Sequence, residues 1–232
     1  MIKIRKASER GHAKYDWLDS YHTFSFADYH DPNYMGFRKL RVINEDRVKA
    51  SEGFDTHPHR DMEIITVVFE GALEHKDSMG TGSVINPGDV QLMSAGTGVT
   101  HSEFNHSKKE SVHLLQIWIM PEQRGLTPSY QQKTFGEDKR NNQLCLIVSR
   151  DGRRNSLTIH QDVDLYAANF SKDFRIEHPV SANRHLWIQL VQGEIKINEL
   201  SLTQGDGVAV SEENKISITA IKPSTFLLFD LA

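Results

Sequence analysis

Short runs of β-branched and aromatic residues, separated by glycine-centred turns, dominate this chain of 232 residues. The run "EIITVVFE" breaks at Gly71, "GSVINPGDVQLMSAG" turns at Gly88-Asp89, and "VHLLQIWIMP" ends at Pro121. Sustained helical periodicity is lacking, and runs of about five to eight residues with regular turns are typical of β-sandwiches and jelly rolls. The sequence therefore predicts an all-β fold.

The two halves of the chain repeat the same order of runs and turns. "VVFEGALEHKD…INPGDVQLMSAG" resembles "QLVQGEIKINEL…LTQGDGVAVSEE", and each contains a Gly-Asp pair, Gly88-Asp89 and Gly205-Asp206. Several turns in the same order indicate an internal duplication. The polar segment 121–143 is the expected connector, and we place the domains at 1–130 and 131–232.

Composition excludes several classes of protein. Hydrophobic residues make up 38% and charged residues 25% of the chain, which predicts a folded chain throughout. A net charge of −4 gives no electrostatic basis for binding nucleic acid or an anionic membrane surface. The single cysteine, Cys145, cannot form an intrachain disulfide, and no stretch resembles a signal peptide or membrane span. We therefore expect a cytoplasmic protein.

Two pairs of polar residues have the spacing that a metal site on strands requires. His57 and His59 in "THPHRDME" are two apart, so their side chains share one face of a strand. His101 and Glu103 in "GVTHSEFNH" repeat that spacing. On adjacent antiparallel strands the pairs would converge, and three imidazoles with a carboxylate suit a divalent metal ion. Each pair alone is commonly only hydrogen-bonded or solvated; their joint occurrence favours a metal site.

Other polar residues near these pairs have weaker assignments. Glu63 could be a ligand, a carboxylate that orients a histidine, or part of a cavity wall, and we expect it near the cavity but off the metal. Arg60 and Gln116 are further candidates for the cavity wall, and His106 is a weak extra candidate ligand. The remaining histidines are expected at the surface or in support of the ligands: His12, His22, His30, His75, His113, His160, His178 and His185.

Several catalytic motifs are missing from the sequence. One cysteine cannot supply the Pro-Cys-x-x-Cys of zinc deaminases. The chain also has no His-Glu-x-x-His helix, no P-loop and no Gly-x-Ser-x-Gly elbow.

The motifs resemble those of a known family. "GFDTHPHRDMEIITVVFEGALEHKDSMG" is similar to the first cupin motif, and "PGDVQLMSAGTGVTHSE" resembles the second cupin motif in the form found in pirins. "HTFSFADYHDP", "PSYQQ" and "DGRRNSLTIHQDVDLYAANF" are also pirin-like, so the resemblance covers nearly the whole chain. It implies a bicupin, two face-to-face jelly-roll β-barrels with metal only in the N-terminal barrel.

The resemblance also implies an activity, because bacterial pirins of this type are associated with quercetin 2,3-dioxygenase activity. The enzyme would cleave flavonols such as quercetin with O2, releasing carbon monoxide and a depside. His57, His59, His101 and Glu103 would hold the metal, with Glu103 also acting as general base. Fe(II) is the first choice for such ligands, although Zn, Cu, Ni, Co or Mn would bind the same set. The alternatives are a non-catalytic metal or redox sensor acting through a regulatory protein partner, and a sealed structural metal site.

Overall fold

The computed structural model describes all 232 residues, and nearly all regular structure in it is β-strand. The helices are three short 3₁₀ turns, Ala7–Glu9, Glu137–Lys139 and Arg153–Asn155. None of them has the length and hydropathy needed to cross a membrane. The prediction of an all-β chain with two cupin domains is confirmed.

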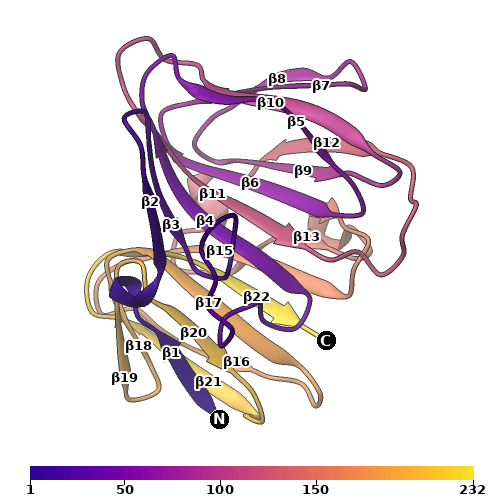
Figure 1. The fold of residues 1–232 in the computed structure, drawn as a ribbon. Coiled ribbons are helices and arrows are strands. Elements are labelled where there is room, and N and C mark those ends of the chain that lie inside the picture. Colours follow the sequence, from indigo (N-terminus) through magenta and orange to yellow (C-terminus); the bar gives the residue numbers. More distant parts are fainter. The chain divides into compact units, whose positions relative to one another are not determined.

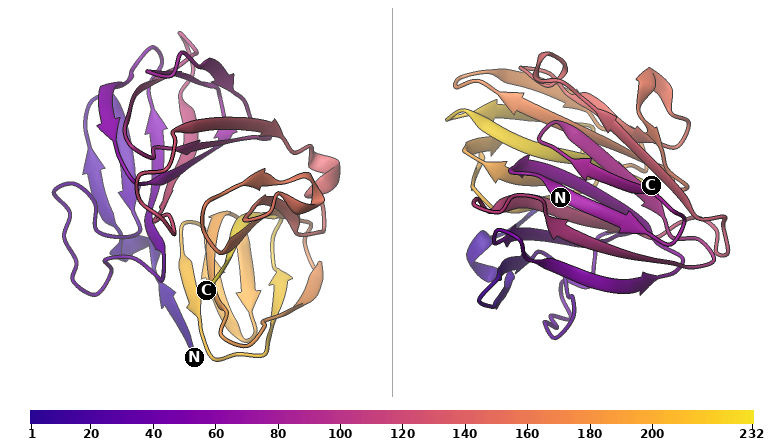
Figure 2. Two further views of the ribbon diagram at one scale, coloured as in Figure 1. Left: turned by 90° about the vertical axis from the view of Figure 1, so that its right-hand side faces the viewer. Right: turned by 90° about the horizontal axis from the view of Figure 1, so that it is seen from above.

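The chain forms two compact units (Figures 1 and 2). The N-terminal unit comprises Gly11–Thr134 and Ile159–Gln161, and the C-terminal unit comprises Met1–Arg10, Phe135–Thr158 and Asp162–Ala232. The first ten residues belong to the C-terminal unit because β1 (Ile2–Arg5) pairs with β20 (Gly207–Val210) of that unit.

The N-terminal unit contains a sheet of seven strands and a sheet of four, which Figure 1 shows as two layers. In spatial order the larger sheet consists of β12 (Ser129–Thr134), β9 (Asp89–Ser94), β6 (Glu63–Glu70), β11 (Val112–Ile119), β4 (Leu40–Val48), β3 (Leu18–His22) and β2 (Gly11–Lys14). The smaller sheet consists of β5 (Gly53–His59), β10 (Val99–Asn105), β7 (Leu73–Asp77) and β8 (Gly82–Ile85).

The C-terminal unit has the same arrangement, and Figure 2 shows its strands curling into a barrel. Its larger sheet consists of β1, β20, β17 (His185–Gln192), β22 (Ser224–Leu231), β15 (Val163–Phe170), β13 (Cys145–Ser149) and β14 (Leu157–Thr158). Its smaller sheet consists of β16 (Arg175–Pro179), β21 (Lys215–Ala220), β18 (Glu194–Ile197) and β19 (Leu200–Thr203).

The strand orders support an internal duplication. The order β9-β6-β11-β4 in one unit corresponds to β20-β17-β22-β15 in the other, and β5-β10-β7-β8 corresponds to β16-β21-β18-β19. The Gly-Asp turns also match in detail. Asp89 accepts a hydrogen bond from the backbone N–H of Asn86, three residues earlier, at 3.0 Å, and Asp206 accepts one from Thr203 at 3.0 Å. Each carboxylate thus closes the turn that starts the following strand.

The interiors of the two units differ in polarity. In the C-terminal unit the inward positions of β18 and β21 are fully buried apolar residues such as Ile195, Ile197, Ile216 and Ile218, which join one large hydrophobic cluster. In the N-terminal unit the corresponding strands β7 and β10 bury His75, His101 and Glu103. A buried polar group is costly unless it is paired or functional. The N-terminal unit is therefore where a site is expected.

Candidate metal centre

His57, His59 and His101 are brought together by the pairing of β5 with β10. The strands are antiparallel, and His101 lies directly opposite His57 in the register. Pro58 stands between the two histidines of β5, and β5 lies at the edge of its sheet, where a missing backbone N–H is tolerated. The sequence prediction of two i, i+2 pairs on adjacent antiparallel strands matches this pairing.

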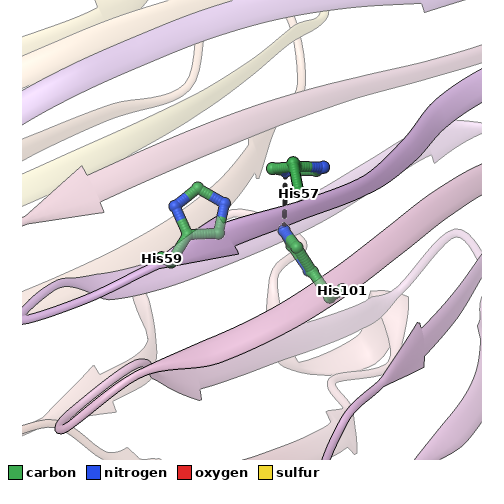
Figure 3. Close-up of side chains that lie close together, drawn as sticks. All are labelled: His57, His59 and His101. Atoms are coloured by element: carbon green, nitrogen blue, oxygen red, sulfur yellow. Dashed lines mark hydrogen bonds between the residues drawn. The ribbon is translucent and has the colours of Figure 1, made fainter.

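The three imidazoles face one another across a small space (Figure 3). The Nε2 atoms of His57 and His101 are 3.0 Å apart. The ring centroids are 4.5 Å apart for His57 and His101, 4.8 Å for His59 and His101, and 4.9 Å for His57 and His59. The ring of Trp118 packs edge-on against His59 with 4.9 Å between the ring centroids, which restricts the orientation of that imidazole.

Two of these rings are held in the unprotonated form that binds metal ions. Burial, followed by the neighbouring imidazoles, lowers the pKa of His59 to about 4 and that of His101 to about 3. Both rings are therefore neutral at pH 7, the form that binds metals. His57 donates from Nδ1 to the carbonyl oxygen of Asp55 at 2.7 Å, which leaves the Nε2 lone pair of His57 toward the other rings. The Nε2 of His59 is buried without a hydrogen-bond partner, so the donor set fits a metal ion.

Glu103 is buried on β10 and lines the same cavity as His57 and His59. Its carboxylate accepts a hydrogen bond from Gln116 Nε2 at 2.6 Å and a longer one from Thr66 Oγ1 at 3.5 Å. Trp118 Nε1 donates to Gln116 Oε1 at 3.3 Å, which orients the amide. Both carboxylate oxygens of Glu103 therefore have a hydrogen-bond donor, which holds the group in place.

His75 joins the cluster although the sequence offered it only as a surface or supporting histidine. It is fully buried on β7, and its Nδ1 lies 3.4 Å from Nδ1 of His101. Its Nε2 lies 3.0 Å from Asp77 Oδ2, and Tyr130 packs on its ring. His75, His101 and Glu103 form a second compact group of possible ligands. The spacing of His75 and Asp77 repeats the i, i+2 pattern of the other two pairs, and this spacing is the sequence signal that could have identified His75 as part of the site.

A cavity of about 230 Å³ opens beside these histidines, with mostly apolar walls. Gln116 lines it, as the sequence predicted, but Arg60 and Glu63 do not. The Arg60 side chain is 73% exposed. Glu63 is buried elsewhere, accepting a hydrogen bond from Ser94 Oγ at 2.6 Å and lying 3.4 Å from His160 Nδ1. The assignment of Arg60 and Glu63 to the cavity wall is therefore corrected.

The fold and the cluster define a cupin with a histidine-rich centre, and comparison with known proteins specifies the family. Residues 3–119 match the pirin family model, and residues 146–231 match the model of the quercetinase C-terminal cupin domain. The chain belongs to the pirin family.

Individual proteins and solved structures are similar to nearly the whole chain. A quercetin 2,3-dioxygenase of Escherichia coli K12 is 52% identical over 231 residues, covering 100% of this chain and 99% of the relative. The crystal structure of the bacterial pirin YhhW of Escherichia coli in complex with nickel(II) superposes with a TM-score of 0.95 at 52% identity, covering 100% and 99% of the two chains. A quercetin 2,3-dioxygenase of Acinetobacter baumannii shares the fold at 20% identity, with a TM-score of 0.80 over 98% of this chain and 85% of that one.

Proposed function

We propose that this protein is a metal-dependent dioxygenase that cleaves flavonols such as quercetin. His57, His59, His101 and Glu103 would hold one divalent ion. The observation that carries the proposal is the position of three clustered imidazoles, two of them kept neutral by burial, beside an apolar cavity. The dioxygenase name and the bound nickel of the Escherichia coli relatives support it.

The residues of the cavity have distinct tasks in this proposal. Tyr15, Leu18, Phe26, Phe54 and Trp118 form apolar walls that would hold a flat aromatic substrate and exclude water. Glu103, held by Gln116 and Thr66, would accept the proton of the flavonol 3-hydroxyl. A bound divalent ion would supply Lewis acidity toward the substrate oxygen and electron exchange with O2.

The overall reaction consumes one flavonol and one O2 and yields one depside and one carbon monoxide. Both oxygen atoms of O2 enter the products, and the carbon that carried the 3-hydroxyl leaves as carbon monoxide. We propose Fe(II) as the first ion to test, because histidines with one carboxylate suit non-haem iron. Ni(II) is the second, because a relative binds it.

Turnover tests the proposal directly. Protein loaded separately with Fe, Ni, Co, Cu or Mn is incubated with quercetin and O2, and flavonol loss and carbon monoxide are measured. We expect both with at least one ion, and we expect Glu103→Ala to abolish them. Failure with every ion would contradict the dioxygenase and leave a metal-binding sensor or a structural site as the better explanation.

A further inference from the structure

The cavity contains a second carboxyl group that neither the metal ligands nor the proposed reaction uses. Asp46 lies on β4, is 4% exposed and lines the cavity. Ser20 of β3, in the adjacent strand, donates its hydroxyl hydrogen bond to Asp46 Oδ1. No lysine, arginine or histidine forms an ion pair with this carboxyl group, and Ser20 is its one side-chain partner.

A carboxyl group buried in this way is costly to the fold. Burial is the main cause that raises the pKa of Asp46 to about 7, and the charges of Glu103 and Glu45 raise it further. A buried carboxyl group without a cation destabilises the folded chain, and such groups occur preferentially at functional sites. The free side of the carboxyl group faces the cavity, so a ligand there could supply its missing partner.

The register of the larger sheet places Asp46 away from the metal ligands but on the same surface. Asn44 lies opposite Gln116, the residue that holds Glu103, and Asp46 is two residues further along β4. Side chains two apart share a face and are separated by about 7 Å along the strand. The cavity thus has one polar group at Glu103 with the histidines and another at Asp46 with Ser20, and Asn44, which is hydrogen-bonded to His22, lies between them on the sheet.

We propose that the Ser20–Asp46 pair binds a second hydroxyl group of the substrate, on the side of the aromatic body away from the 3-hydroxyl group. The inference rests on the proposed function and narrows its substrate class to planar aromatics that carry two well-separated hydroxyl groups. A hydroxyl group can donate to the carboxylate or accept from the protonated carboxyl, so either form of Asp46 can make the bond.

Two flavonols that differ in their hydroxyl groups measure how much the Ser20–Asp46 contact contributes to binding. Quercetin carries hydroxyl groups on the rings beyond the 3-position, whereas 3-hydroxyflavone has the same flat body and only the 3-hydroxyl. Dissociation constants for both are measured on nickel-loaded protein without O2, from the shift of the flavonol absorption band. Wild type, Asp46→Leu, Asp46→Asn and Ser20→Ala are compared, so binding is read without turnover.

We expect wild type to bind quercetin at least tenfold more tightly than 3-hydroxyflavone, because a hydrogen bond to a charged group is strong in an apolar cavity. Asp46→Leu should remove that preference by weakening quercetin binding while leaving 3-hydroxyflavone binding unchanged or tighter. Asp46→Asn, which keeps hydrogen-bonding atoms, should retain part of the preference, and Ser20→Ala should reduce it.

Glu45 provides a matched control on the same strand. Its side chain points to the opposite face of β4 from Asp46 and lies 3.0 Å from His113, outside the cavity lining. Glu45→Gln should leave the ratio of the two dissociation constants unchanged.

Equal losses for both probes in Asp46→Leu would overturn the inference while leaving the dioxygenase proposal intact. If wild type neither binds nor turns over either flavonol, the dioxygenase proposal and the inference about Asp46 are both contradicted. Thermal unfolding shows whether each variant is folded, and Asp46→Leu should be at least as stable as wild type because it removes a buried unpaired carboxyl group.

Discussion

Two of the side chains that would bind the metal ion are held in place by hydrogen bonds. His57 is fixed by the Asp55 carbonyl, and Glu103 by Gln116. We predict that His101→Ala and Glu103→Gln each lower nickel affinity more than 100-fold, since each removes a ligand charge or atom. Competition with a chromophoric chelator measures the affinity.

His106 serves as the control for this prediction, being a histidine on the same segment. It is exposed and pairs with Glu74 at 3.2 Å. His106→Ala should bind nickel as wild type does. A loss comparable to that of His101→Ala would mean that the ligand set is wrongly assigned.

His75 acts on the metal centre through another residue. If His101 binds metal through Nε2, its Nδ1–H points at His75 Nδ1, and His75 Nε2–H then points at Asp77. Such supporting partners commonly change metal affinity by 10–100-fold. We predict a nickel affinity lower by about that factor in His75→Ala, together with a changed ligand-field spectrum of the cobalt-loaded protein. Tyr130→Phe, which keeps the ring packed on His75, should change neither the nickel affinity nor the cobalt spectrum. If His75→Ala leaves both unchanged, His75 does not support His101 as a metal ligand.

The stability of the metal-free protein should depend on pH through Asp46. The folded-state pKa of about 7 exceeds the ordinary 3.8, so ionisation of Asp46 opposes folding at high pH. Each unit of pKa shift corresponds to about 1.4 kcal/mol. Ionisation of Asp46 therefore lowers the free energy of unfolding by about 4 kcal/mol above pH 7 and by less than half of that at pH 5, and the effect disappears below pH 3.8. Asp46→Asn should therefore unfold at a higher temperature than wild type at pH 8, with a gap that narrows by pH 5. A gap independent of pH would contradict a titrating Asp46.

Among the strands, the alternation of side chains along β5 predicts which residues share a face but does not predict the register of β5 with β10. Alternation correctly places His57 and His59 on one face, but the register shifts between His101 and Glu103, so that Glu103 lies opposite Phe54. Asp55 and Thr56 are consequently both exposed. This β-bulge supplies the carbonyl that fixes the His57 tautomer. A bulge depends on pairing with a distant strand, so the sequence of β5 alone could not predict it.

The closeness of β5 to β10 depends on Gly53. A Cβ added there would lie 2.2 Å from the backbone oxygen of Glu103 and 2.5 Å from the Cα of Phe104. These contacts are with backbone, which cannot move aside without separating the strands. We predict that Gly53→Ala lowers both the melting temperature and the nickel affinity, because His57 and His101 are held on the two strands. Gly82, at the edge of β8 with no atom closer than 3.9 Å, is the control. Equal effects at the two positions would show that strand spacing does not set the affinity.

At the scale of the whole molecule, duplication was readable from the sequence because glycine turns and Gly-Asp pairs recur in order. Asp46 and Ser20, which complete the cavity beside the predicted Gln116, were not, because they come from two different strands and carry no shared local pattern. The sequence also did not predict that the first ten residues belong to the C-terminal unit. β1 pairs with β20, about 200 residues further along the chain, and a four-residue run carries no signal for such a partner.

Duplication with divergence leads to a prediction about metal stoichiometry. In the C-terminal unit, β21 corresponds to β10 but presents Ile216 and Ile218, and apolar packing fills the barrel there. Both compact donor groups lie on β5, β7 and β10 of the N-terminal unit. Protein saturated with nickel and freed of excess should therefore contain one ion per chain by elemental analysis, and His57→Ala combined with His101→Ala should contain none. Two ions per chain, or one remaining in the double variant, would contradict a single metal site that depends on His57 and His101.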